Sequence, residues 1–251
     1  MAGNIGLTDV QTAKFDELFA RSTGQGKPLT PNMEKELSEL MRKKTNPELP
    51  QGAKTYLKSW LKRHLFNRKQ DWKAIVIEKG LQVEPQGIDL LNVTKGIFAE
   101  KNERHFGNEF MQGTPDIILD DCVRDIKSSW DLFTFPMFDD AVPNEDYYWQ
   151  LQGYMILTGK RKAHLDYVLI DTPMPLILQD LKKLYFQSGG AAEDWHPEAY
   201  EFMYTNYRFG DIPDDKRIKT YSFDFEEGIS EKIEQRVGMC RDYLNQLIER
   251  N

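Results

Sequence analysis

The chain is poor in the residues that build disulfide frameworks and zinc sites. Its 251 residues include only two cysteines and four histidines. Cys122 and Cys240 lie far apart, and neither belongs to a CxxC pair or has a histidine at ligand spacing. Neither a zinc site nor a disulfide framework is therefore predicted, and both cysteines are expected to be buried thiols.

Long apolar runs are absent as well. No stretch approaches the roughly 18 residues that a membrane-spanning helix needs. Met1 to Val10 also lacks the basic-then-apolar order of a secretion signal. These absences predict a protein without a membrane role that stays in the cytoplasm.

Two widespread catalytic signatures are missing too. There is no G-x-S-x-G motif, and Gly26-Lys27 and Gly159-Lys160 lack the preceding glycine of a phosphate-binding loop. The length and the 40% hydrophobic content are those of a soluble α/β protein with its own core. The net charge, 33 minus 40 or −7, does not exclude nucleic-acid binding, because phosphate contacts need only a locally basic surface.

The most informative feature that is present is a predicted β-hairpin. Residues 117–119 and 122–127 are expected to be its strands, with the reversal at Asp120-Asp121. If the hairpin is centred there, the numbers of paired residues add to 241, and Asp116 lies opposite Asp125. Paired Cβ atoms are about 5 Å apart, so the two carboxylates repel unless something compensates them.

A hard divalent cation would provide that compensation, since it takes carboxylate and carbonyl oxygens as ligands. Side chains alternate along a strand, so Lys127 is expected on the face of Asp125 while Ile126 points into the core. An ammonium group would then stand beside a metal site. The alternative is a surface hairpin whose charges merely face water.

These residues resemble a known family. Pro115-Asp116 followed by Asp125-Ile126-Lys127 is similar to the PD-(D/E)xK nuclease signature. Upstream, Gly80 to Pro85 resembles the G-x-x-x-E-P opening of a helix that brings a further metal-facing glutamate. Downstream, Gln150 to Tyr154 matches the Q-x-x-x-Y helix of the branch with RecB-type nuclease domains and phage-lambda-type (YqaJ-like) recombination exonucleases. The order and spacing of the motifs agree over residues 79 to 170.

The resemblance implies an α/β (α+β) fold with a restriction-endonuclease-like core, in which helices flank a central mixed sheet. We expect a helical annex over residues 1–50 and the nuclease domain over residues 51–251. The implied metal ligands, for Mg²⁺ with Mn²⁺ able to substitute, are Glu84, Asp116, Asp125 and the Ile126 carbonyl. Lys127 would orient or polarise the attacking water, and the three acids complete the catalytic set.

Two of these assignments have alternatives. Glu84 precedes Pro85, where an acid also suits a helix N-terminus without any metal. Other acids upstream of the hairpin are candidates for the same role: Glu78, Glu100, Glu103 and Glu109. Gln150 and Tyr154 lie one helical turn apart and share a face. They would contact the substrate or a ligand carboxylate, or else form an interior polar pair.

Helices are expected around this core. Residues 7–46 predict a helical hairpin, and a stronger helix follows from Gly52, with Ala53, Leu57, Trp60, Leu61 and Leu65 as its apolar face. Its other side is basic, with Lys54, Lys58, Lys62 and Arg63, and Arg68, Lys69 and Lys73 nearby. This side would bind DNA phosphates or simply face water. Further predictions are helices at 146–157 and 228–249 and strands at 165–170 and 217–223.

An aromatic segment follows the hairpin and contains Trp130, Phe133, Phe135 and Phe138. These rings would pack in the core or stack on bases.

The predicted function is a Mg²⁺-dependent DNA nuclease, an exonuclease on double-stranded ends in phage-type or bacterial recombination and repair. A structure-selective or single-strand nuclease is one alternative, and a non-catalytic DNA-binding or assembly protein on the same fold is another. A two-carboxylate glycosidase would leave Lys127 unexplained. The expected partners are DNA, a single-strand annealing or recombination protein, and further copies of the chain.

Overall fold

The computed structural model describes residues 6–68, 74–187 and 197–250. The chain divides into two compact units, one from residues 1–70 with 228–251 and the other from residues 71–227. The division predicted from sequence, after residue 50, falls elsewhere. None of the helices in the described residues is both long and apolar enough to cross a bilayer.

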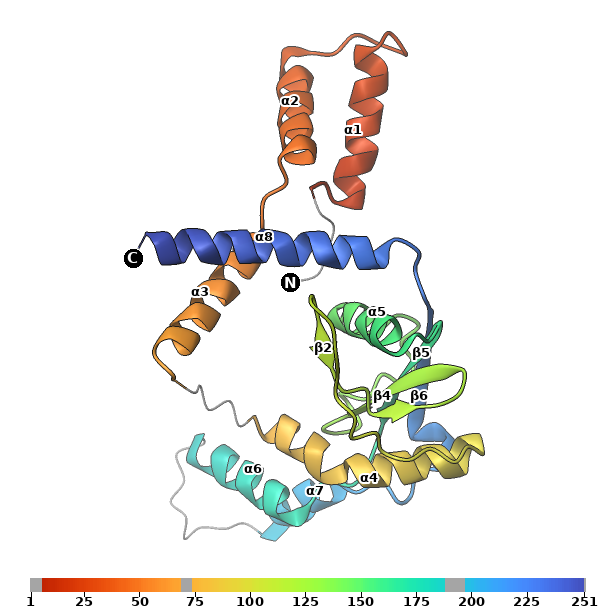
Figure 1. Ribbon diagram of the computed structural model, residues 1–251. Coiled ribbons are helices and arrows are strands. Elements are labelled where there is room, and N and C mark those ends of the chain that lie inside the picture. The colour runs from red at the N-terminus through yellow and green to blue at the C-terminus, as the bar shows by residue number, and fades with distance from the viewer. Residues whose placement is uncertain (1–5, 69–73, 188–196, 251) are drawn as a thin grey trace. The chain divides into compact units, whose positions relative to one another are not determined.

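The described residues of the first unit form four helices. Helices α1 (Asp9–Ser22) and α2 (Pro31–Thr45) form the predicted helical hairpin, and Thr8 and Thr30 cap their N-termini with side-chain oxygens (Figure 1). Helix α3 (Gln51–Leu65) packs against the last helix, α8 (Ile229–Glu249), by burying Leu57 among apolar residues of α8. This packing of α3 with the C-terminal helix moves the boundary beyond residue 50.

Helix α3 is less apolar on its inner side than the sequence predicts. It buries Ala53, Leu57 and Leu61, but Trp60 and Leu65 are 38% and 56% exposed. On its basic side, Lys54 pairs with Glu48 at 3.3 Å. Lys58 and Lys62 are exposed and Arg63 is half-buried. Lys69 and Lys73 lie outside the described residues.

The second unit contains the predicted central mixed sheet. Strands β3 (Ile117–Ile118), β4 (Cys122–Ser128), β5 (Lys162–Val168) and β6 (Ile218–Asp224) lie side by side in that order. β4 and β5 are parallel and the other two pairs are antiparallel. Helix α5 (Asp146–Thr158) makes the crossover that parallel strands require, and it ends at Gly159, whose φ is 71°. A short hairpin, β1 (Phe106–Gly107) and β2 (Gln112–Gly113), precedes the sheet.

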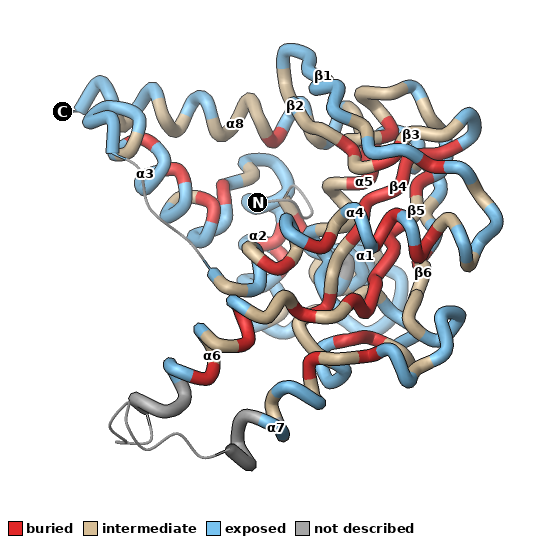
Figure 2. The backbone as a smooth tube through the Cα atoms, turned by 90° about the horizontal axis from the view of Figure 1, so that it is seen from below, coloured by how far each residue is buried: buried red, intermediate tan, exposed pale blue. Residues whose placement is uncertain are grey.

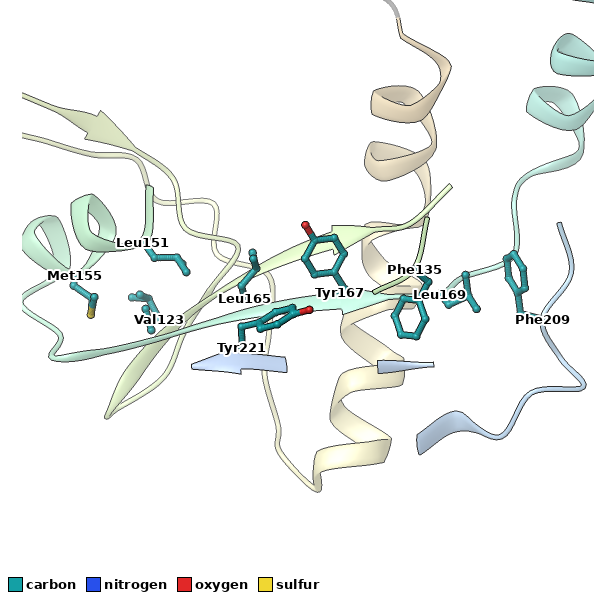
Figure 3. Close-up of a cluster of buried hydrophobic side chains, with 10 residues drawn as sticks. Val123, Phe135, Leu151, Met155, Leu165, Tyr167, Leu169, Phe209 and Tyr221 are labelled. Atoms are coloured by element: carbon teal, nitrogen blue, oxygen red, sulfur yellow. The ribbon is translucent and has the colours of Figure 1, made fainter. Parts of the chain in front are cut away.

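The two faces of the sheet have separate cores. Val123 and Leu165 point toward α5 and its Leu151 (Figure 3), whereas Ile126 and Val168 pack with apolar residues of α4 (Ile75–Lys95). This division follows from the alternation of side chains along β4 and β5. Both strands are buried along most of their length (Figure 2), as strands covered on both faces must be.

A glycine brings α4 close to the sheet. A Cβ at Gly87 would lie 3.1 Å from Cγ2 of Val168 and 3.4 Å from Cγ2 of Ile126. The missing side chain therefore lets the helix that carries Glu84 approach the strand that carries Asp125.

A buried lysine joins α4 to the segment after β4. Lys79 is fully buried, and its Nζ donates hydrogen bonds to the carbonyl oxygens of Ser129 at 2.7 Å and Trp130 at 2.9 Å. Burial lowers the pKa of Lys79 to about 7. This contact was not predicted from the sequence. The sequence analysis also missed three helices: α6 (Met174–Gln187), α7 (Pro197–Asn206) and the short 3₁₀ helix η1 (Asp214–Lys216).

The hairpin β1–β2 packs against α5 through a second close approach. A Cβ at Gly113 would lie only 2.6 Å from Cε1 of Tyr154, a distance that requires the ring to move. The ring of Tyr154 packs against the core beneath α5, so it has little room to shift.

We expect Gly113→Ala to lower the free energy of unfolding by about 1 to 3 kcal/mol, the usual cost of overpacking. Urea denaturation measures this. Gly153→Ala is the matched control, because the Cβ added there meets only Sδ of Met111, at 3.7 Å. In a Tyr154→Leu background, Gly113→Ala should lower the free energy of unfolding much less. The close contact would be contradicted if Gly113→Ala left stability unchanged, or if the double variant lost as much unfolding free energy as the two single variants together.

Candidate active site

The register of the hairpin is the one predicted from the sequence. Ile117 pairs with Arg124 and Ile118 with Val123, so both pairs add to 241. The turn is closed by a hydrogen bond from the Leu119 N–H to the Cys122 carbonyl at 2.9 Å. Asp116 precedes β3 by one residue and therefore lies at the position opposite Asp125.

On the α5 face of β4, the buried Asp125 forms an ion pair with the half-buried Lys127. The Asp125 side chain is 2% exposed, and the Lys127 Nζ lies 2.5 Å from its Oδ2. Burial raises the pKa of Asp125, against the opposing effect of Lys127. Burial acts to lower the pKa of Lys127, but Asp125 and Asp116 outweigh it and raise that pKa. Lys127 is therefore an ammonium ion at neutral pH.

Asp116 faces the backbone of β4. Its Oδ2 accepts a hydrogen bond from the Ile126 N–H at 2.6 Å. Burial, followed by the nearby charge of Asp125, raises the pKa of Asp116 to about 6, and Glu84 adds to the effect. The charges of Asp125 and Glu84 thus both disfavour the ionised form of Asp116.

Glu84 reaches the same site from the middle of a helix. The sequence predicted that a helix opens at the Gly80–Pro85 motif, which is wrong: α4 begins at Ile75, and Pro85 lies inside it. Proline favours the first turn of a helix, which explains the error. A helix-start role for Glu84 is therefore excluded. Its Oε2 lies 2.9 Å from Nζ of Lys101, and its Oε1 is buried and accepts no hydrogen bond.

Gln150 and Tyr154 share one face of α5, as predicted, and reach the acidic site. The Gln150 Nε2 donates to the Tyr154 hydroxyl at 2.8 Å and to Oδ1 of Asp125 at 3.3 Å. The pair thus fixes the second oxygen of Asp125. It is a contact to a candidate ligand carboxylate and not an interior pair satisfied by backbone groups.

A cavity of about 580 Å³ opens at this site. Its charged wall consists of Glu84, Asp116 and Lys127, and Ile126 lies beside them. The remaining lining is largely apolar and aromatic and includes Val76, Ile77, Leu81, Trp130, Tyr147 and Tyr167. Such a combination of a few convergent charges with apolar walls is typical of ligand sites.

Residues outside the motifs also contribute to this site. The ring centroid of Tyr147 lies 5.0 Å from the Lys127 Nζ, and its position beside Gln150 was the only signal for it in the sequence. Lys101 had no signal at all. Of the aromatic segment, Phe135 is buried, whereas Phe133 and Phe138 are 88% and 89% exposed.

The donor set suits a hard divalent cation. Glu84 Oε1 and Asp125 Oδ2 are buried carboxylate oxygens without a hydrogen bond, although Lys127 pairs with the second of them. No group of three acidic, histidine or cysteine side chains among the described residues is arranged as a finished metal site. Each carboxylate instead faces a group of the protein itself: Asp125 faces Lys127, Asp116 an amide, and Glu84 Lys101. The oxygen ligands are those that Mg²⁺ and Mn²⁺ prefer.

The predicted DNA-contacting residues of α3 belong to the other unit. Lys54, Lys58, Lys62 and Arg63 lie within residues 1–70, whereas the acidic site lies within residues 71–227. Their role in binding DNA stays a prediction.

In the absence of divalent cations, we expect Asp116→Asn to stabilise the protein at alkaline pH. The folded pKa of about 6 lies above the ordinary value of 3.8, so the fold disfavours the ionised carboxylate. This penalty is absent below about pH 4, where the group is protonated in both states, and it is complete above about pH 6.

The asparagine keeps an acceptor for the Ile126 N–H. Its gain in unfolding free energy should be about 1 to 3 kcal/mol at pH 8 and close to zero at pH 4. Urea denaturation in the presence of a chelator measures it. A gain of the same size at both pH values would contradict the crowding of charge at this site.

Comparison with known proteins gives structural matches. No family model matches the chain, and no curated protein matches it significantly. A phage-related exonuclease from Haemophilus somnus 129PT is similar in structure, with a TM-score of 0.67, 26% identity and coverage of 94% of each chain. The alkaline exonuclease LHK-Exo from Laribacter hongkongensis matches with a TM-score of 0.52 and 15% identity over 78% of this chain and 80% of its own.

LHK-Exo in complex with dAMP also matches, with a TM-score of 0.52, 13% identity and coverage of 94% of this chain and 92% of that one. The first of these matches extends over nearly the whole chain, and the mixed sheet carries the Asp116, Asp125 and Lys127 constellation at its hairpin. The chain is therefore similar in fold to these phage-type and alkaline exonucleases, and it carries the motifs of the PD-(D/E)xK nucleases that its sequence resembles.

Proposed function

We propose that the chain is a metal-dependent deoxyribonuclease that degrades double-stranded DNA from its ends. The observation that carries this proposal is the buried Asp125, which faces Lys127 on its own strand and crowds Asp116 and Glu84. The structurally similar proteins are exonucleases, and one of them is bound to dAMP, a DNA nucleotide. Mg²⁺ is the proposed cofactor, with Mn²⁺ able to substitute.

Glu84, Asp116, Asp125 and the Ile126 carbonyl would hold the cation. A bound ion of this kind lowers the pKa of a coordinated water and offsets the negative charge of the scissile phosphate. The protein's own residues would orient the carboxylates that hold the ion. Gln150 fixes one oxygen of Asp125, and the Ile126 N–H fixes one oxygen of Asp116, so both carboxylates are oriented before substrate arrives.

Lys127 would act as a cation beside the attacking water. Without a bound metal ion, Asp125 and Asp116 raise its pKa, so it is protonated at neutral pH. An ammonium at this point can donate a hydrogen bond that orients the water, and it stabilises the charge that builds on the phosphate oxygens. Burial beside Asp125 and below the Tyr147 ring strengthens this electrostatic effect.

Cleavage of a linear duplex tests the proposal directly. With Mg²⁺ the wild-type protein should release nucleotides, and a chelator should abolish the reaction. Lys127→Ala and Asp125→Asn should each lower the rate by at least about 100-fold, the usual loss of an electrostatic catalytic group. Lys162→Ala is the matched control, since Lys162 is an exposed lysine of the neighbouring strand.

A covalently closed circle of the same sequence separates the alternatives. An exonuclease leaves it intact, whereas a structure-selective or other endonuclease cuts it. Binding of the linear duplex without any cleavage, with or without Mg²⁺, would contradict the proposed activity and favour a non-catalytic DNA-binding protein.

A further inference from the structure

A second lysine stands at the acidic site, outside the signature motif. The Nζ of Lys101 lies 2.9 Å from Oε2 of Glu84. The Glu84 side chain is only 13% exposed, whereas that of Lys101 is 49% exposed. The ammonium group of Lys101 thus forms an ion pair, from the solvent side, with the Glu84 carboxylate that helix α4 brings to the cavity.

The backbone on both sides of Lys101 is anchored. Ala99 exchanges two hydrogen bonds with the side chain of Asn92 in α4, at 2.8 and 2.9 Å. Asn102 donates its backbone N–H to the Asp116 carbonyl at 2.7 Å and its Nδ2 to the Pro115 carbonyl at 2.8 Å. The Cα of Lys101 is therefore held between α4 and the start of β3, while its long side chain is half exposed and can turn.

Lys101 and a divalent cation compete for the same carboxylate. The lysine pairs only with the Oε2 of Glu84, and the Oε1 is buried without a hydrogen bond. An ion bound to Glu84 would place two positive charges beside the ammonium, and like charges a few ångströms apart repel. The ammonium then needs another anion, and the substrate brings one as a phosphate group.

We propose that Lys101 exchanges partners during binding, from Glu84 in the resting protein to a phosphate oxygen of DNA when a divalent cation binds Glu84. This inference rests on the proposed function, because it requires a cation and DNA at this site. The exchange couples the two ligands: DNA that takes Lys101 away makes cation binding easier. By linkage, the cation strengthens DNA binding by the same factor.

Mn²⁺ titration of the DNA-free protein, followed by the electron paramagnetic resonance of free Mn²⁺, tests the first half of the exchange. Lys101→Gln should bind Mn²⁺ on the order of tenfold more tightly than the wild type, because the competing charge is gone. Lys95→Gln removes an exposed lysine of α4 and should bind like the wild type. In a Glu84→Gln background, Lys101→Gln should have no effect.

The second half is tested by repeating the titration with a duplex whose terminal linkages are non-hydrolysable phosphorothioates. The duplex should tighten Mn²⁺ binding in the wild type and in Lys95→Gln. In Lys101→Gln it should tighten it clearly less. An equal effect of the duplex in all three proteins would overturn the exchange.

Failure of the exchange and failure of the proposed function give different results. If Asp116→Asn weakens Mn²⁺ binding but Lys101→Gln binds like the wild type or more weakly, the site holds a cation and the exchange is wrong. If Asp116→Asn binds Mn²⁺ as well as the wild type does, the cation is elsewhere, and both proposals are overturned.

Discussion

Three carboxylates crowded at the open end of one hairpin are the constraint on which the site depends. Asp125 is buried, Asp116 is held at the adjacent amide, and Glu84 arrives from α4 on the other side of the sheet. Keeping neighbouring, largely buried carboxylates ionised costs free energy unless each of them has a compensating partner. In this fold the partners are Lys127, the Ile126 N–H and Lys101. Under the proposals made above, a divalent cation would replace the two lysines as the partner of these carboxylates.

The packing of the second unit brings these groups together. Gly87 allows α4 to approach β4 and β5, and without that approach Glu84 would stand further from Asp116. Gly113 leaves room for the ring of Tyr154, whose hydroxyl accepts a hydrogen bond from the same Gln150 side chain that contacts Asp125. Lys79 holds α4 to the segment that follows β4. Residues remote from the chemistry thus determine the positions of the charged ones, as preorganised sites require.

Local rules predicted the hairpin but not the contacts between distant segments. The turn at Asp120-Asp121 and the alternation along β4 were enough to predict the register and the shared face of Asp125 and Lys127, but not their ion pair. The start of α4 was misjudged because Pro85, usually a residue of the first turn, lies in its interior. The contact of Lys101 with Glu84 and the packing of α8 on α3 depend on tertiary structure, which no spacing in the sequence records.

If these carboxylates share one divalent cation, anomalous diffraction from a crystal soaked in Mn²⁺ will locate it. We expect one strong anomalous peak within coordination distance of Asp116, Asp125 and the Ile126 carbonyl, with Glu84 turned toward it and released from Lys101. A crystal in which Mn²⁺ binds elsewhere, or in which Lys101 stays paired with Glu84 at saturating Mn²⁺, would contradict this expectation.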